Sequence, residues 1–360
     1  MQGIIGGYNG EPVGLTRCFA VGDTAFYDTR IGYGLVGKSE ELANIGYIGA
    51  DAFGHAHLGG DDDTVSDVDR GLWVDRNCVH IGAYAFGHNP NLRWIGLPGP
   101  SHDISDISEM DQIRRLSLES SQFYGCSGLS NIINLEFQTS FSTNAIVGCN
   151  SLPFLNLFYV DTVSVDNSTD MAGIPVSYIH IGPALASQLS TMVSMFQGCS
   201  MLNKVTIATS TGPDGYKFSI PDYCFSGLST LTSVEGLYSC SGIGSYAFVG
   251  TNIEFSNPDQ LMYVQSIGEY ALNGCPYVDV NYLWNCRHIG TCAFENNSNI
   301  SELIFGPSME YIGDGAFDLC TNLYGVYFHN DESSMPNITM GSYAFAACGN
   351  LTNVCLTNTS

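Results

Sequence analysis

Basic residues are scarce in this sequence. Its 360 residues include 11 Lys and Arg against 35 Asp and Glu, which gives a formal net charge of −24 at pH 7. A chain this acidic repels phosphate backbones and anionic membrane surfaces, so we expect no nucleic-acid partner. Charged residues of both signs make up only 13% of the chain, so Asn, Ser, Thr, Gly and Tyr must supply most of the polar surface.

Long apolar runs are missing as well. No stretch of about 18 consecutive apolar residues occurs, which predicts no membrane-spanning helix and no membrane insertion. Residues 1–8 lack the basic region and the apolar core of a secretory signal peptide, so no signal peptide is visible. We therefore expect that such a peptide was removed or that the protein becomes exposed by another route, such as release within a virus particle.

The motifs of common enzyme and metal sites are absent too. The sequence has no His-Glu-x-x-His, Gly-x-Ser-x-Gly or P-loop motif and no Cys-x-x-Cys pair. The acidic stretch at residues 54–75 could hold calcium, but it lacks the fixed spacing and closing Glu of an EF-hand loop and is interpreted as a solvated loop. His55 and His57, at the start of this stretch, are interpreted as loop residues. We expect a non-enzyme with no catalytic residue, cofactor or metal.

What the sequence does contain is an internal repeat. The phrase Ile-Gly-x-x-Ala-Phe recurs, and its last residue is named here the anchor. Weaker copies, in which parts of the phrase are lost, bring the anchors to twelve, several of them 22 to 29 residues apart. The clear copies and close variants lie at residues 21–26, 48–53, 81–86, 243–248, 267–272, 289–294, 312–317 and 340–345, and the weaker anchors are Phe123, Ile146, Phe196 and Phe225.

Each copy continues in the same way. Many have a cysteine three residues after the anchor and aliphatic residues six and nine after it. Residues 202–207 alternate apolar and polar, which predicts a strand with one buried face. The Gly four residues before the anchor is expected to permit a sharp turn, and the cysteine to act as a small buried hydrophobe. Disulfides between neighbouring copies stay open, with Cys126–Cys149 and Cys320–Cys348 as the candidate pairs.

One such unit cannot bury its apolar side alone, so neighbouring units must stack. The pattern Ile-Gly-x-x-Ala-Phe-x-x-Cys-x-x-Leu-x-x-Val resembles the BspA-like leucine-rich repeat over about residues 18–357, and it is degenerate between roughly 100 and 200. The resemblance implies a solenoid of the leucine-rich-repeat type, with one parallel β-sheet, short helical or turn segments opposite and about twelve coils. It also implies a surface or secreted protein that acts in adhesion or partner binding, without catalytic residues.

The expected organisation is a single repeat domain. Residues 1–17 form an N-terminal arm or cap, and residues 18–360 form one solenoid with an acidic insertion at 54–75 and an irregular insertion at 158–190. A second acidic stretch at 103–111 is interpreted as another loop. No polar cap follows the last expected strand. Another copy of the chain could cover that end in a homo-oligomer, a different partner could cover it, or the end could simply fray.

The repeat places a binding site on the outward face of the parallel sheet. Residues eight, ten and twelve after each anchor point outward, and exposed aromatic clusters usually mark an interaction site. Adjacent coils could instead pack these side chains on one another, or an insertion could cover them. The predicted binding residues are Trp94, Phe154, Tyr282, Trp284, Ile304 and Tyr327, with Val280 and His329 beside them.

Two functions fit these observations. The first is a non-catalytic scaffold that binds protein or glycan at a cell or particle surface, as an adhesin does. The alternative is a structural subunit, in which further copies of the chain are the partner, within a fibre, decoration or surface layer of a virion or extracellular assembly. Both place the protein outside the cell or on a surface.

Overall fold

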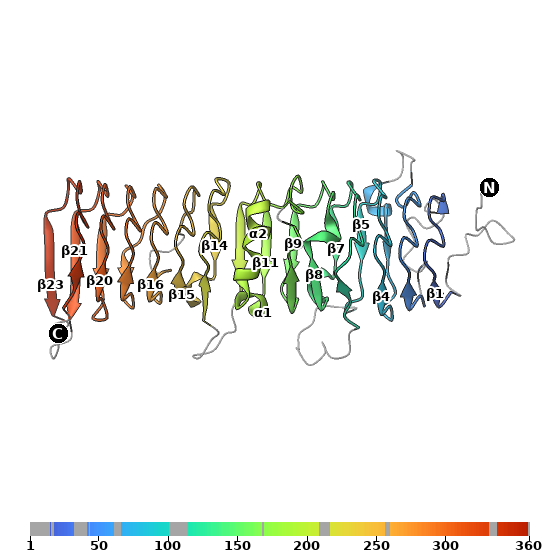
Figure 1. Cartoon of the computed structure of the whole chain (residues 1–360), viewed down its shortest axis with the longest axis horizontal. Coiled ribbons are helices and arrows are strands. Elements are labelled where there is room, and N and C mark those ends of the chain that lie inside the picture. The colour runs from blue at the N-terminus through green and yellow to red at the C-terminus, as the bar shows by residue number, and fades with distance from the viewer. Residues whose placement is uncertain are drawn as a thin grey trace. The chain divides into compact units, whose positions relative to one another are not determined.

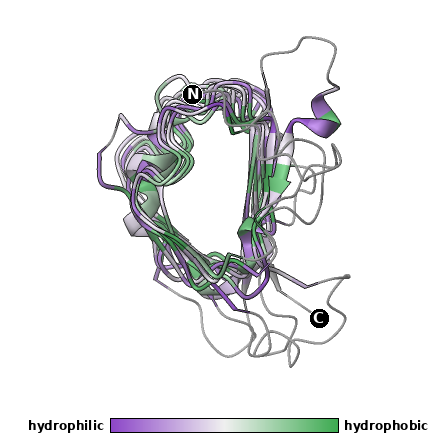
Figure 2. Ribbon diagram, turned by 90° about the vertical axis from the view of Figure 1, so that its right-hand side faces the viewer, coloured by the Kyte–Doolittle hydropathy of each residue, from purple (hydrophilic) through white to green (hydrophobic). Residues whose placement is uncertain are grey.

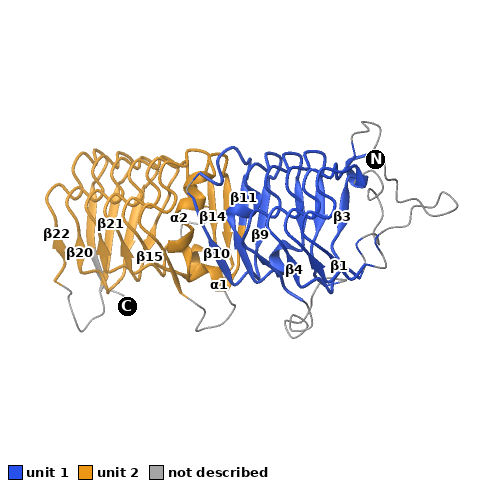
Figure 3. Cartoon of the chain, turned by 45° about the vertical axis from the view of Figure 1, so that its right-hand side comes forward, with its two compact units in different colours: residues 1–179 blue, residues 180–360 orange. Residues whose placement is uncertain are grey.

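The structure is a computed structural model, and it divides into two compact units, residues 1–179 and 180–360 (Figure 3). Nearly all of the expected N-terminal arm and the acidic runs at 61–63 and 103–111 lie outside the described residues, so the expected domain boundaries stay a prediction. The structure describes residues 15, 18–31, 42, 44–60, 66–100, 114–167, 169–208, 217–255, 260–330 and 337–358.

The chain folds as a parallel β-solenoid of about twelve turns with little helix, which confirms the expected fold class. Within each unit, successive coils place their short strands side by side, as Figure 1 shows. Every strand pair whose register is resolved is parallel, because each coil returns the chain to the same edge before the next strand begins.

Unit 1 contains three three-stranded sheets. The first has the order β1-β2-β4, the second β3-β5-β7 and the third β10-β8-β6. Their strands are β1 (Ala20–Val21), β2 (Tyr47–Ile48), β3 (Gly71–Trp73), β4 (His80–Ile81), β5 (Trp94–Gly96), β6 (Ser117–Leu118), β7 (Asn131–Ile133), β8 (Ser140–Ser142) and β10 (Thr162–Ser164), and the unit also contains β9 (Phe154–Leu157) and the 3-10 turns η2 (Asp67–Asp69), η4 (Leu135–Phe137) and η5 (Thr143–Ile146).

Unit 2 contains a six-stranded sheet in the order β13-β15-β16-β18-β20-β22 and a four-stranded sheet in the order β17-β19-β21-β23. Strand β11 (Tyr178–Ile181) crosses the boundary between the units, and β12 (Lys204–Ile207) pairs with β14 (Ser233–Glu235). The other strands are β13 (Phe218–Ile220), β15 (Cys240–Ile243), β16 (Ser266–Ile267), β17 (Tyr282–Leu283), β18 (His288–Ile289), β19 (Glu302–Phe305), β20 (Tyr311–Ile312), β21 (Gly325–Asn330), β22 (Thr339–Met340) and β23 (Asn353–Asn358), with η6 (Leu237–Ser239) as a 3-10 turn.

Two columns of strands therefore run through the coils, where the repeat pattern predicts one. The sheet expected nine residues after the anchor is present, as in β19 and β21. A second column of short strands ends at the Ile of Ile-Gly, as in β18 and β20. Among the described residues, α-helix occurs only at the end of the expected irregular insertion and just after it. Here α1 (Pro183–Ala186) and α2 (Leu189–Gly198) replace the usual anchor turn, and α2 contains the anchor Phe196.

The anchor turns form a hydrogen-bonded ladder of their own. In the coil of Phe294, the residues two before and two after the anchor, Cys292 and Asn296, have φ of 51° and 61°. The amides of Cys292, Phe294 and Asn296 donate to Asp314, Ala316 and Asp318 of the next coil at 2.8–2.9 Å. The left-handed residues on either side of the anchor thus let every second amide of the turn donate to the next coil, as the amides of a strand do.

In the coils that have a Gly four residues before the anchor, with Gly22 of the first coil as the exception, this Gly allows close approach between coils. A Cβ on Gly290 would lie 2.6 Å from the backbone N of Glu269 in the preceding coil, and one on Gly268 would lie 2.5 Å from Ser245 N. Neither residue has a positive φ. The expected turn role of this Gly is thus replaced by a steric one, since any side chain would push the coils apart.

The core is a stack of anchor side chains. Phe86 lies between Phe53 and Phe123 in unit 1, with ring centroids 5.7 and 6.0 Å apart. Phe317 lies between Phe294 and Phe345 in unit 2, at 5.1 and 5.2 Å. Figure 2 shows the coils running around an interior. The rings of Phe53, Phe86, Phe123, Phe294 and Phe317 are fully buried.

Every one of the 13 cysteines is a free thiol, and the candidate pairs Cys126–Cys149 and Cys320–Cys348 are not bonded. The repeat cysteines do more than fill space. The Sγ of Cys126 donates to Phe86 O at 3.0 Å and that of Cys320 donates to Phe294 O at 3.3 Å, each across to the anchor of the preceding coil. Asn297 uses the same position to donate to Leu272 O. The position three after the anchor therefore supplies a donor to a buried carbonyl.

Candidate functional site

Three of the predicted site residues lie in one row on the four-stranded sheet of unit 2. Tyr282 of β17 pairs in register with Ile304 of β19, which pairs with Tyr327 of β21. In β19 the burial alternates, with Leu303 and Phe305 buried and Ile304 partly exposed, so the row points away from the core. These three side chains therefore lie on the outward face of the sheet, where the repeat register predicts them.

A second pair lies beyond this row, since Trp284 follows the end of β17 and His329 lies near the end of β21. The ring of Trp284 contacts that of His329 with centroids 5.2 Å apart. The Nδ1 of His329 is buried without a hydrogen-bond partner, so the pair holds an unsatisfied polar atom next to an indole. Val280, expected to face outward two residues before Tyr282, is fully buried instead. Strand β17 begins only at Tyr282, so the alternation does not extend back to that residue.

Acidic side chains adjoin this face. The ring of Tyr327 folds back over Gly325 of its own strand. A Cβ on that glycine would lie only 2.7 Å from the tyrosine Cε2. Gly325 pairs in register with Glu302. Partial desolvation raises the pKa of Tyr327, and the Glu302 carboxylate adds to the shift because a negative neighbour disfavours the phenolate. The face is thus a mixture of aromatic, aliphatic and acidic groups, which we name the unit 2 face: Tyr282, Trp284, Glu302, Ile304, Tyr327 and His329.

Trp94 lies on the corresponding sheet of unit 1, in a different setting. Its ring lies over Gly71 of β3, and Trp73 lies over Gly96 of β5, so each indole uses the space that a neighbouring Gly leaves. The two rings meet edge to face at 5.7 Å. The missing side chains at these two glycines make room for both indoles on the sheet.

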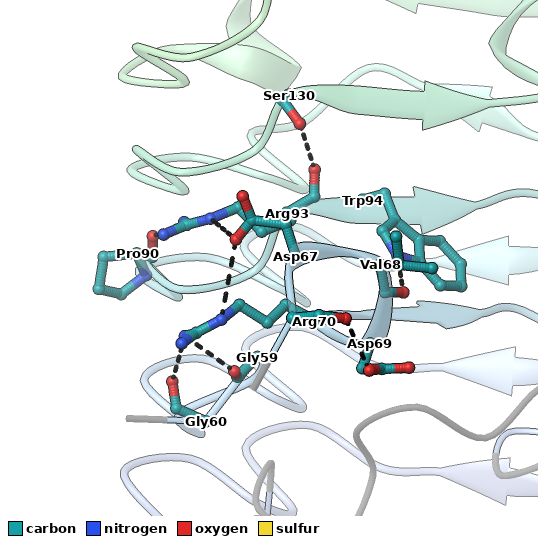
Figure 4. A network of polar contacts seen from close by, with 11 residues as sticks. Gly59, Gly60, Asp67, Val68, Asp69, Arg70, Pro90, Arg93, Trp94 and Ser130 are labelled. Carbon is teal, nitrogen blue, oxygen red and sulfur yellow. Dashed lines mark hydrogen bonds and ion pairs between the residues drawn. The ribbon is translucent and has the colours of Figure 1, made fainter. Parts of the chain in front are cut away.

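A segment of the chain itself is fastened over Trp94, as Figure 4 shows. The indole Nε1 donates to the carbonyl of Val68, in η2, at 2.7 Å. Asp67 Oδ1 accepts from Arg93 Nε at 3.1 Å and lies 3.8 Å from Arg70 Nε. Arg70 is 5% exposed and donates to the carbonyls of Gly59 and Gly60, both at 3.3 Å. Two of the few basic residues therefore hold part of the expected acidic insertion against the sheet.

Phe154 of unit 1 is separate again. It lies in β9, is 38% exposed, and stacks on Tyr178 with centroids 4.9 Å apart. The six predicted residues therefore do not form one site. Tyr282, Trp284, Ile304 and Tyr327 share the sheet of unit 2, whereas Trp94 and Phe154 occupy two other places in unit 1.

Two features of the described residues bear on catalytic chemistry, namely the arrangement of metal-ligating side chains and the reactivity of the thiols. No group of three or more His, Cys, Asp or Glu there is arranged to hold a metal ion. Burial raises the pKa of Cys78 to about 11 and those of Cys126 and Cys320 to about 12, so these thiols stay protonated and are poor nucleophiles at neutral pH. No helix among the described residues is long and apolar enough to cross a membrane.

One further aromatic set lies outside the predicted site. Tyr223, Tyr246 and Tyr270 stand two residues before successive anchors of unit 2 and stack on one another with centroids 5.0 Å apart. Their signal is visible in phrases such as Ser-Tyr-Ala-Phe at 245–248. It escapes an analysis that follows only the strand positions.

Comparison with known proteins identifies the repeat. The family model described as "BspA type Leucine rich repeat region (6 copies)" matches residues 186–264 and 254–360. Residues 186–360 therefore belong to the BspA-type leucine-rich repeat family, a family without an indicated catalytic activity. The same anchor phrase continues N-terminal to the matched part, at 21–26, 48–53 and 81–86.

Several solved structures are similar at low identity. A leucine-rich repeat protein from Bacteroides ovatus is 19% identical with a TM-score of 0.42, over 90% of this chain and 76% of that one. A leucine rich cell surface protein from Faecalibacterium prausnitzii is 16% identical with a TM-score of 0.27, over 80% and 79%. An internalin from Listeria monocytogenes is 13% identical with a TM-score of 0.26, over 88% and 75%. A search of curated proteins found no match.

Proposed function

We propose that the protein is a non-catalytic binding scaffold at a cell surface, and that it holds a protein ligand on the unit 2 face. The observation that carries the proposal is the in-register row of Tyr282, Ile304 and Tyr327, with Trp284 beside it. Parallel strands hold these side chains at fixed spacing, so little conformational entropy is lost when a partner docks on them. Tyr and Trp are also the residues that most often dominate binding energy at protein interfaces.

A protein ligand fits this face better than a glycan does. The row combines an aliphatic side chain, Ile304, with tyrosines that keep hydroxyls at the surface, and Tyr282 is 37% exposed. Aliphatic groups gain from contact with apolar protein surface, whereas sugars are bound chiefly by ring stacking and hydrogen bonds. The cell-surface location is supported by the description of one structural neighbour as a leucine rich cell surface protein. The virion alternative gains no support from the comparisons above.

The proposal is tested by measuring saturable binding of the labelled chain to arrays of immobilised extracellular proteins and of glycans. We expect binding to a protein target, weakened at least about tenfold by the triple variant Tyr282→Ser, Ile304→Ser, Tyr327→Ser, since loss of interface anchors costs about 2 kcal/mol or more. Binding only to glycans would contradict the protein ligand. Binding unchanged in the triple variant would contradict the site.

The structural-subunit alternative is separated by native mass spectrometry of the wild-type chain and the triple variant. A monomer at micromolar concentration agrees with a binding scaffold. An oligomer or polymer of the wild-type chain that is replaced by a monomer in the triple variant would show that the partner on this face is another copy of the chain. An oligomer that persists in the triple variant would place the contact elsewhere, as at the C-terminal end where the sequence analysis expects it.

A further inference from the structure

Unit 2 carries a column of stacked tyrosines apart from the unit 2 face. Tyr223, Tyr246 and Tyr270, named here the tyrosine column, occupy the same repeat position in three successive coils. The rings of Tyr223 and Tyr246 are parallel within 2°, and those of Tyr246 and Tyr270 within 17°, each pair with centroids 5.0 Å apart. The backbone ladder fixes this spacing, because Tyr223 N–H donates to Ser245 O and Tyr246 N–H to Glu269 O, both at 2.9 Å.

The fold does not require tyrosine at this position. The three residues have φ of 58°, 59° and 52°, in the left-handed region that bulky side chains rarely adopt. Other coils place small or polar residues there with the same backbone, namely Thr24, Asp51, Ser121, Cys292 and Gly315, and single tyrosines, Tyr84 and Tyr343, occupy it in two coils away from the column. The positive φ is therefore common to the position, and the column is distinguished by tyrosine in three adjacent coils.

The rings leave part of their faces open. Carbon atoms of stacked rings in contact lie about 3.5–4.0 Å apart, so parallel rings with a larger centroid separation are displaced sideways. The 5.0 Å separation therefore means that neighbouring tyrosines overlap only in part. Tyr223 at one end of the column is 50% exposed. An exposed π-face attracts a cation placed over it, and a flat cation can also stack on it.

Carboxylates lie beside the same rings. Partial desolvation raises the pKa of Tyr246, and the charge of Glu269 adds to that shift. The hydrogen bond of Tyr270 to the Cys292 thiol raises its pKa most, and Glu295 contributes as well. Asn273 Nδ2 donates to Glu295 Oε2 at 2.8 Å, which holds that carboxylate at the column. The column therefore combines open aromatic faces with two negative groups.

We propose that the tyrosine column, together with Glu269 and Glu295, binds arginine side chains of a protein partner. A guanidinium group is flat, so it stacks on a tyrosine face while its N–H groups donate to a neighbouring carboxylate. A lysine ammonium has the same charge but cannot stack, and it is more strongly hydrated. The net charge of −24 draws basic segments to the chain in general, and the column selects arginine among them. The inference does not depend on the unit 2 face.

The test compares an octa-arginine with an octa-lysine peptide, both titrated into the full chain at physiological salt and followed by fluorescence anisotropy of a label on the peptide. Plain charge attraction treats the two alike. We expect octa-arginine to bind at least about fivefold more tightly, as a desolvated cation–π contact allows. Equal affinities for the two peptides would overturn the proposal.

Variants then place the preference on the column. Tyr246→Leu removes the central ring and should abolish the preference for octa-arginine, whereas Tyr246→Phe, which keeps the ring, should retain it. Glu269→Gln with Glu295→Gln should weaken octa-arginine more than octa-lysine. Tyr263→Leu is the matched control, because Tyr263 is 52% exposed but stands outside the column. An undiminished preference in Tyr246→Leu would refute the site. Should that variant not fold, Tyr223→Leu at the exposed end carries the same test.

Discussion

The outward faces of equivalent sheets differ between the two units. In unit 1, Trp94 on the β3–β5–β7 sheet donates to Val68 of a segment that Arg70 and Arg93 hold in place. In unit 2, Tyr282, Ile304 and Tyr327 lie in register on neighbouring strands of the β17–β19–β21–β23 sheet, and Tyr282 remains 37% exposed. Outward positions of the repeat thus secure a piece of the chain in unit 1 and present an aromatic surface in unit 2.

The difference shows that an aromatic residue at an outward repeat position is not by itself a binding site. The N–H of an indole can donate to the chain's own backbone, as that of Trp94 does to Val68 O. The construction of the core, in contrast, is the same in both units. Each unit has stacked Phe anchors and a buried cysteine thiol that donates to the anchor carbonyl of the preceding coil. The units should therefore respond alike to changes in the anchor stack and differently to changes on their surfaces.

Alkaline pH should separate the units most strongly. Buried thiols have pKa values raised from 9.0 to about 11–12, so the folded state must keep them protonated while the unfolded chain releases the proton. Their stabilisation is complete below about pH 9 and is lost as the pH rises toward 11–12, by about 1.4 kcal/mol per thiol at pH 10. Unit 2 holds more thiols with a pKa of about 11–12 than unit 1 does. They are Cys199, Cys240, Cys275, Cys286 and Cys320 in unit 2, and Cys78 and Cys126 in unit 1.

Tryptophan fluorescence can follow each unit, because Trp73 and Trp94 report on unit 1 and Trp284 on unit 2. In urea titrations at pH 8 and pH 10, a Trp284→Phe chain should lose less stability than a chain in which Trp73 and Trp94 are Phe. Replacing Cys275 and Cys320 by Ser should flatten the pH dependence of unit 2. Equal losses in both chains would break the comparison.

The anchor stack gives the next largest effect and should be the same in both units. Phe317→Ala and Phe86→Ala each remove a fully buried ring from between two others. Each should lower the free energy of unfolding of its unit by about 3–5 kcal/mol, the usual cost of a large cavity. Urea unfolding followed by the unit's own tryptophan measures it. A loss in unit 1 below about half that of unit 2 would show that the two cores follow different rules.

The glycine before the anchor gives an intermediate effect. Gly290→Ala places a Cβ 2.6 Å from the backbone of Glu269, so neighbouring coils must move apart. We expect a loss of about 1–3 kcal/mol, typical of overpacking, in a thermal or urea unfolding experiment. Gly349→Ala is the control, because nothing lies within 4 Å of its Cβ position. Similar effects of the two substitutions would argue against the close-approach explanation.

The smallest effect concerns the segment over Trp94. Arg70→Met keeps the apolar stem but removes the donors to Gly59 and Gly60 and the charge beside Asp67. Unit 1 should lose about 1–2 kcal/mol, since buried carbonyls are left without a partner, and its tryptophan emission should shift to the red. Arg287→Met in unit 2 breaks only an exposed ion pair with Glu310 at 3.6 Å and should cost under about 0.5 kcal/mol. Unaltered emission in Arg70→Met would contradict the proposed fastening.

The coils and their inward faces were predictable because they repeat. Leu303, Ile304 and Phe305 alternate as the two-residue period demands, and the anchors recur at spacings that only stacked coils satisfy. The second column of strands escapes prediction because its members, such as His288–Ile289, are too short to show an alternation.

The candidate site was predictable only in part. The contact of Trp94 with Val68 joins a repeat position to a non-repeating segment, so no periodicity signals it. The burial of Val280 depends on where β17 begins, which the pattern does not define. The donor role of Cys126 depends on which carbonyl of the anchor turn lacks a partner, and only the three-dimensional ladder reveals that.

The central claim is that partner contacts belong to the face of unit 2 and not to that of unit 1. The most direct measurement is the dissociation constant of the protein ligand for two matched variants, Tyr282→Ser with Tyr327→Ser in unit 2 and Trp73→Ser with Trp94→Ser in unit 1, by surface plasmon resonance. The account predicts a loss of at least about tenfold for the first pair and less than about twofold for the second. A larger loss for the unit 1 pair, or equal losses for both, would contradict it.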